Sequence, residues 1–135
     1  MLEEEATAYQ VIRNFEDLVA WQRARQLTSD IYALTNAGEF RTDFGLRDQI
    51  RRSAVSVMSN IAEGNERGSA QEYFRFLTIA KASCAEVRSL LYVAHDAGYI
   101  DEATFIRHMD SARRVAQLVG ALRKSIGRRI ADQRR

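Results

Sequence analysis

The stretch Gln49–Gly64, QIRRSAVSVMSNIAEG, carries two different stripes of side chains at helical spacing. One stripe is apolar and recurs every three or four residues: Leu46, Ile50, Ala54, Val57 and Ile61. The stripe beside it is polar: Gln49, Ser53, Ser56, Asn60 and Glu63. Burying polar groups beside a core is costly unless each finds a hydrogen bond. We therefore expect this helix to pack closely on a neighbouring helix or another subunit that supplies those bonds.

The composition of the chain favours a globular, helical protein. Its 135 residues suit one domain, and 46% are hydrophobic and 28% charged. The absence of proline permits long uninterrupted helices. A single cysteine, Cys84, rules out an internal disulfide and is typical of a reducing cytoplasm. No apolar run approaches the length of a membrane span, so we expect a cytoplasmic protein without a membrane partner.

Apolar residues at spacings of three and four predict four helices, with short connections between them. We expect the first over Glu16–Asn36 and the second from Thr42 or Asp43 to about Glu63, where Gly64 ends it. A capping box at Ser69 opens the third helix, which Gly98 closes, and Asp101 caps the fourth. The predicted fold is all-α, an antiparallel up-down-up-down four-helix bundle over residues 15–127. Residues 1–14 are expected to be a frayed segment and residues 128–135 a loose basic tail.

The same spacing predicts the core. The side chains expected to be buried are Leu27, Ile31, Ile50, Val57, Ile61, Leu77, Cys84, Val87, Leu91, Met109 and Leu122. Four aromatic residues lie partly off these stripes, and some of them are expected to be covered by another subunit: Trp21, Tyr73, Phe74 and Tyr92.

Three segments carry a resemblance to a known family: FEDLVAWQRA (15–24), FGLRDQIRRSAVSVMSNIAEGNER (44–67) and EYFRFLTIAKASCAEV (72–87). The chain resembles the four-helix bundle proteins of the 23S rRNA intervening-sequence type, most specifically in the NIAEG of residues 60–64. The resemblance implies an antiparallel four-helix bundle that assembles as a homopentamer. A related branch comprises the accessory variability proteins of diversity-generating retroelements, which are basic pentameric barrels that bind a reverse transcriptase and RNA.

Basic residues near the C-terminus are the main indication of function. Residues 1–40 carry three basic and seven acidic side chains, whereas residues 101–135 carry nine basic and four acidic ones. The candidate nucleic-acid-binding residues are Arg107, Arg113, Arg114, Arg123, Lys124, Arg128 and Arg129. Such a stripe can hold phosphates with a salt-dependent affinity, but cations also suit the C-terminal end of a solvated helix. Because aromatic residues are not interleaved with these cations, backbone contacts are favoured over base recognition.

A polar network between the second and third helices is the other candidate site. Its predicted members are Gln49, Arg52, Ser56, Asn60, Glu63, Ser83 and Glu86. We expect Glu86 to contact a basic or amide group of the second helix, and we expect a structural role for this network instead of a catalytic one.

The sequence offers no catalytic or metal-binding set. Neither His95 nor His108 follows a glutamate by three residues, as a di-iron bundle requires, and Cys84 lies in the apolar stripe. We therefore predict no enzyme activity, no metal and no cofactor. The leading hypothesis is an oligomer that contacts RNA or a ribonucleoprotein partner such as a reverse transcriptase. The alternative is a protein-interaction scaffold without nucleic-acid binding, and an enzyme with a buried polar site is the least favoured.

Overall fold

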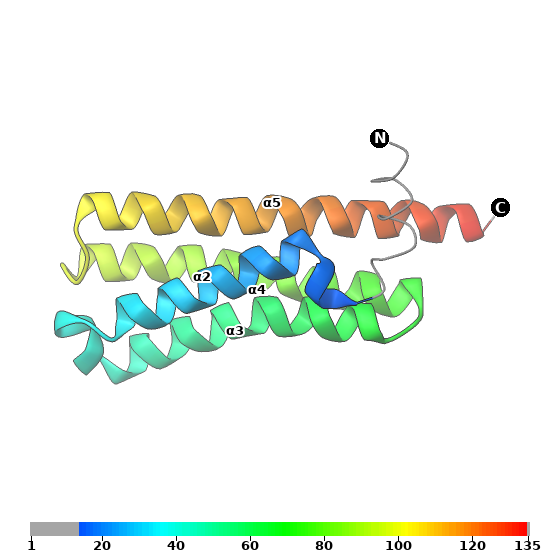
Figure 1. The fold of residues 1–135 in the computed structure, drawn as a ribbon. Helices are drawn as coiled ribbons and strands as arrows, with labels where there is room; N and C mark the ends of the chain where they lie inside the picture. The colour runs from blue at the N-terminus through cyan, green and yellow to red at the C-terminus, as the bar shows by residue number, and fades with distance from the viewer. Residues whose placement is uncertain (1–13, 135) are drawn as a thin grey trace.

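The computed structural model describes residues 14–134 and shows an antiparallel four-helix bundle, so the predicted all-α fold is confirmed (Figure 1). The main helices are α2 (Val19–Thr35), α3 (Phe44–Glu66), α4 (Ala70–Asp96) and α5 (Glu102–Gln133). Two short 3-10 helices, η1 (Phe15–Asp17) and η2 (Gly38–Thr42), precede α2 and α3. Expectations for residues 1–13 lie outside the described residues.

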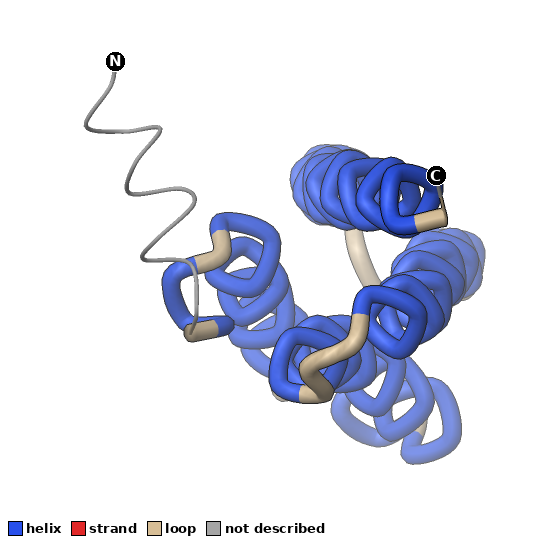
Figure 2. The backbone as a smooth tube through the Cα atoms, turned by 90° about the vertical axis from the view of Figure 1, so that its right-hand side faces the viewer, coloured by secondary structure: helices blue, strands red, loops and turns tan. Residues whose placement is uncertain are grey.

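The four long helices do not share the packing equally. The most extensive contacts join α4 to its sequence neighbours α3 and α5, whereas α2 packs less extensively on α3 and α5. Figure 2 looks along the bundle and shows the helices side by side around a common interior. None of the helices within residues 14–134 is long and apolar enough to cross a membrane.

The core forms from the apolar stripes. Every side chain predicted to be buried is buried except that of Leu122, which is half-buried. Of the aromatic residues expected to lie off the stripes, Tyr73 is buried within the subunit, Trp21 and Phe74 are half-buried, and Tyr92 is exposed. Tyr73 therefore needs no second subunit to cover it.

Polar side chains begin three of the helices at the positions that the sequence indicates. The backbone N–H of Leu46 donates to the side chain of Asp43, that of Glu72 to Ser69, and that of Thr104 to Asp101. Each bond satisfies one donor that the first turn of a helix leaves free. The first helix begins differently from the prediction, because Leu18 is extended and separates η1 from α2.

The predicted end of α3 at Gly64 is wrong. The helix continues to Glu66, and the glycine that adopts a positive φ in the turn after it is Gly68, at +82°. Gly64 is buried inside the helix, where an added Cβ would lie 2.8 Å from Phe76 Cβ and 3.0 Å from Tyr73 Cδ1. Glycine is needed here for the close approach of α4, not to stop a helix.

The loose basic tail predicted for residues 128–135 is also corrected. Helix α5 continues to Gln133, and Figure 1 shows it extending past the turn between α3 and α4. Gly127 does not end the helix, because it packs against the ring of Phe74, with an added Cβ 3.2 Å from Phe74 Cε2. Arg128 and Arg129 are therefore part of the same continuous helix as the other cations of α5.

Candidate nucleic-acid interface

Helix α5 has one buried side and one cationic side. Its buried side consists of Met109, Ala112, Val115, Val119 and Ile126. The helix carries seven arginines and lysines against three carboxylates, so it is strongly positive. At 3.6 residues per turn, Arg107, Arg114 and Arg128 lie within about one-sixth of a turn of one another along about 30 Å. All three are exposed, and Lys124 lies beside them.

These cations have little acidic compensation. The guanidinium of Arg113 lies 3.9 Å from Asp110 Oδ1, between exposed side chains. Within residues 14–134, no other arginine or lysine of α5 forms an ion pair. An exposed pair at such a distance contributes little, so the face keeps its positive potential.

Arg123 differs from the other cations because it is held in one orientation. Its guanidinium carbon lies 4.3 Å from the centre of the Phe74 ring, and its Nε donates to Thr78 Oγ1 at 2.8 Å. The Thr78 hydroxyl donates in turn to the backbone oxygen of Phe74 at 2.9 Å. Stacking and one hydrogen bond thus fix the forked guanidinium group of Arg123. Its two Nη atoms make no hydrogen bond among the described residues.

Arg129 lies on the inner edge of the face, near Tyr73. Burial raises the pKa of the Tyr73 hydroxyl above its usual value, while a hydrogen bond from Asn65 and the charge of Arg129 oppose that rise. The Asn65 amide nitrogen donates to Tyr73 Oη at 3.4 Å. The seven candidate cations therefore divide into an outer stripe, a fixed arginine at the α4 edge and Arg129 beside Tyr73.

Part of the predicted polar network joins α3 to α4. The hydroxyls of Ser56 and Ser83 lie 2.8 Å apart, and the Asn60 amide donates to the backbone oxygen of Ser56 at 2.8 Å and to its hydroxyl at 3.0 Å. Ser53, which is buried, donates its hydroxyl proton to Glu86 Oε1. These bonds satisfy polar groups at a close helix contact and involve no cation.

The partner predicted for Glu86 is wrong, and three other members lie outside the network. Glu86 contacts the hydroxyl of Ser53, not an arginine or amide, because Arg52 points into solvent and Arg51 turns toward α2. Glu63 accepts instead from Arg67 one turn later, at 2.9 Å on the surface. The side chains of Gln49 and Arg52 are exposed and make no hydrogen bond within the described part of the chain.

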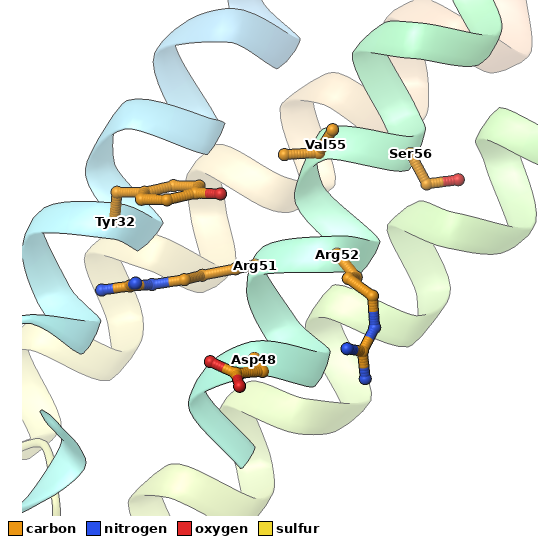
Figure 3. A pocket seen from close by; sticks show the side chains of 6 residues that line it. All are labelled: Tyr32, Asp48, Arg51, Arg52, Val55 and Ser56. Atoms are coloured by element: carbon orange, nitrogen blue, oxygen red, sulfur yellow. The ribbon is translucent and has the colours of Figure 1, made fainter. Parts of the chain in front are cut away.

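A hollow on the surface between α2 and α3 was not predicted from the sequence. It measures about 640 Å³, and Figure 3 shows its lining: Tyr32, Asp48, Arg51, Arg52, Val55 and Ser56. Arg51 reaches from α3 toward α2 and lies along the ring of Tyr32, whereas Arg52 points from the other side of α3 (Figure 3). The sequence shows the pair Arg51 and Arg52 beside the polar stripe, but Tyr32 becomes their neighbour only when α2 packs on α3.

The remaining chemically reactive side chains do not converge. Within residues 14–134, no three histidine, cysteine or carboxylate side chains are grouped so that they could hold a metal ion. His95 Nε2 lies 2.8 Å from Glu102 Oε2, and His108 Nδ1 lies 2.7 Å from the backbone oxygen of Thr104. Burial raises the pKa of the Cys84 thiol to about 11, which disfavours its nucleophilic thiolate.

The fold and the cationic face together define a class: small all-α bundle proteins with a positively charged outer helix. Within that class, a family model described as 23S rRNA-intervening sequence protein matches residues 16–121. The chain therefore belongs to the 23S rRNA-intervening sequence protein family.

One solved structure shows how far the fold is shared. It is the crystal structure of a protein with unknown function from the S23 ribosomal protein family of Bacteroides thetaiotaomicron VPI-5482. The two chains are 20% identical and superpose with a TM-score of 0.72 over 78% of this chain and 99% of that one. At this identity the similarity concerns the fold alone. A comparison with curated proteins gives no significant match.

Proposed function

We propose that this protein is a non-enzymatic, cytoplasmic, oligomeric module that contacts RNA, or a ribonucleoprotein partner such as a reverse transcriptase, through the cationic face of α5. The observation that carries the proposal is the row formed by Arg107, Arg114, Lys124 and Arg128, which is exposed and has no ion pair among the described residues. Phosphates neutralise such a row by releasing condensed counterions, without reading base sequence.

The geometry of α5 suits a polyanion better than a single small anion. The row extends along a straight helix for about 30 Å, which spans several phosphates of one strand. The guanidinium of Arg123 lies about half a turn from Arg114, at the α4 edge, and offers a separate donor pair of the geometry that phosphate oxygens accept in a bidentate manner. Each contact is weak on its own, so useful affinity requires several together.

An oligomer would supply that multiplicity. The family resemblance implies a homopentamer, and the surface of one subunit leaves large apolar side chains open to solvent. These are Val19, Tyr32, Phe44, Val55, Ile79, Tyr92, Val93 and Ile106. Subunit contacts would cover some of them, and a ring would present several copies of the α5 face to one RNA.

The test is RNA binding across a salt series, with a charge-reversed variant. Replacing Arg114, Lys124 and Arg128 by glutamate should abolish binding at low salt and flatten the dependence of affinity on salt. The control replaces Arg23, Arg41 and Lys81 by glutamate, which changes the net charge equally at exposed positions outside α5. Equal losses in both variants would show that only net charge matters, and unchanged binding in the α5 variant would contradict the proposal.

A scaffold for an acidic protein is the second candidate. It is favoured by the contrast between residues 1–40, with three basic and seven acidic side chains, and residues 101–135, with nine and four. Wild-type protein that binds no RNA even at low salt would favour this candidate.

A further inference from the structure

We propose that the hollow between α2 and α3 binds an unpaired nucleotide of single-stranded RNA, with the base stacked on Tyr32 and the adjoining phosphates held by Arg51 and Arg52. This inference rests on the proposed RNA binding, and it adds a second contact surface of different chemistry. The face of α5 recognises phosphates alone, whereas this hollow combines an exposed aromatic ring with two cations (Figure 3).

Arg51 is fixed in one orientation before any ligand arrives. Its guanidinium carbon lies 4.6 Å from the centre of the Tyr32 ring, and its Nε donates to Thr35 Oγ1 at 2.8 Å. Thr35 is buried and donates in turn to the backbone oxygen of Ile31 at 2.7 Å. An arginine held by stacking and by Nε presents its two Nη atoms as a rigid fork that matches two phosphate oxygens.

The same arrangement occurs around Arg123 at a separate place in the bundle. In both cases a threonine donates to a backbone oxygen of its own helix, accepts from the arginine Nε at 2.8 Å, and lies beside the stacked aromatic ring. The difference is the ring: Tyr32 is 43% exposed, whereas Phe74 is half-buried beneath Gly127. Only the α2–α3 hollow therefore offers an open aromatic surface next to its fork.

The charges of the hollow favour an anion in spite of Asp48. Asp48 accepts from Arg47 Nε at 2.9 Å, so its charge is already compensated. Arg51 and Arg52 have no carboxylate partner among the described residues. The hollow thus retains two uncompensated cations at opposite rims, with the exposed side chain of Val55 between them.

Stacking makes this surface selective for single strands. An unpaired base can leave its neighbours and lie against an aromatic ring, whereas a base within a duplex keeps its faces covered by adjacent pairs. The face of α5, which lacks interleaved aromatic side chains, has no means of making this distinction. The two surfaces are therefore separable by the strandedness of the RNA.

The experiment measures the affinity of the full chain for a short oligouridylate and for a duplex RNA of equal length, by fluorescence anisotropy. Tyr32→Leu should weaken binding of the oligouridylate roughly tenfold, as expected for the loss of one stacked base, and leave the duplex affinity unchanged. Tyr32→Phe, the matched control, keeps the ring and should bind both RNAs like the wild type. Arg51→Lys keeps the charge but loses the fork, and it should show the same selective loss as Tyr32→Leu.

The outcomes separate this inference from the proposed function. If the wild type binds neither RNA, both are wrong. If binding depends on the α5 cations but Tyr32→Leu and Arg51→Lys match the wild type on the oligouridylate, the hollow is not a binding site and the inference alone is overturned. The inference is equally overturned if both variants change the mass of the particle, because the hollow is then a contact between subunits.

Discussion

At Gly64 there is no room for a side chain between α3 and α4. An added Cβ would lie 2.8 Å from Phe76 Cβ. Because a Cβ is bonded directly to the backbone, it cannot move aside unless α4 itself shifts. We expect Gly64→Ala to lower the free energy of unfolding by about 1–3 kcal/mol, as overpacking does. Urea denaturation measures this change.

Gly120 provides the matched control for that substitution. It lies inside α5, where an added Cβ meets no atom within 4 Å. Gly120→Ala should therefore raise the free energy of unfolding by roughly 0.5–1 kcal/mol, because alanine has the higher helix propensity. Equal stabilities for the two alanine variants would contradict the interpretation of Gly64 as a close-packing position.

Burial changes the chemistry of Cys84. Burial raises the pKa of its thiol from 9.0 to about 11, and the charge of Arg88 opposes this only in part. We expect alkylation of the folded protein to be very slow at neutral pH and to become rapid after unfolding in urea. Labelling at the same rate in both states would show that the thiol is accessible in the folded bundle.

The same pKa shift predicts a dependence of stability on pH. Between pH 9 and 11 the unfolded chain releases the thiol proton while the folded chain retains it, so this group lowers stability as the pH rises above 9. From pH 9 to 11, the unfolding free energy of the wild type should therefore fall relative to that of Cys84→Ala. A constant difference would contradict the shift.

At the scale of the elements, the contact between α3 and α4 includes a pair of hydroxyl groups beside the apolar core. Ser56 and Ser83 lie 2.8 Å apart in a half-buried position, so alanine at Ser56 leaves the Ser83 hydroxyl without this partner, whereas alanine at Ser83 leaves Ser56 only the Asn60 amide. A double-mutant cycle should give a coupling of about 0.5–1.5 kcal/mol. Ser59→Ala, on the exposed side of α3, should change the stability little and serves as the control.

Helix starts could be predicted from the sequence better than helix ends. A side chain that caps a first turn acts within its own segment, so Ser69 and Asp101 could be identified from the sequence, and the cap of α3 could be narrowed to Thr42 or Asp43, of which the structure shows Asp43. A glycine is ambiguous, since it serves either a left-handed turn or a close approach of another helix. Gly64 and Gly127 serve the second purpose, and their partners lie on a different helix.

The candidate site could also be predicted only where its residues belong to one helix. Arg107, Arg114, Lys124 and Arg128 belong to one helix, so their periodicity places them near one face without knowledge of the fold, whereas Arg123 lies half a turn away from Arg114. The hollow beside Tyr32 and Arg51 depends on how α2 lies across α3, which no local pattern specifies. The partner of Glu86 likewise depends on how α4 packs on α3, and it is the hydroxyl of Ser53 in place of the predicted basic or amide group.

At the scale of the whole molecule, the proposed assembly predicts that some exposed apolar side chains are covered by another subunit. Tyr92, Val93 and Ile106 are each about half exposed and are candidates for such a contact. Light scattering at micromolar concentration should therefore report a particle well above the 15.4 kDa of one chain. A particle of 15.4 kDa under these conditions would remove the avidity on which the RNA proposal depends.

The unequal packing of the four helices has a consequence for how the molecule opens. Because α2 makes less extensive contacts than α4, its detachment exposes less apolar surface than global unfolding and should need a smaller free energy. Hydrogen exchange in the native state should show α2 amides exchanging through this partial opening, while those of α4 exchange only through complete unfolding. An RNA bound across α2 and α3 would close this opening and slow exchange in α2 selectively, so that protection of one helix would report occupancy of the hollow.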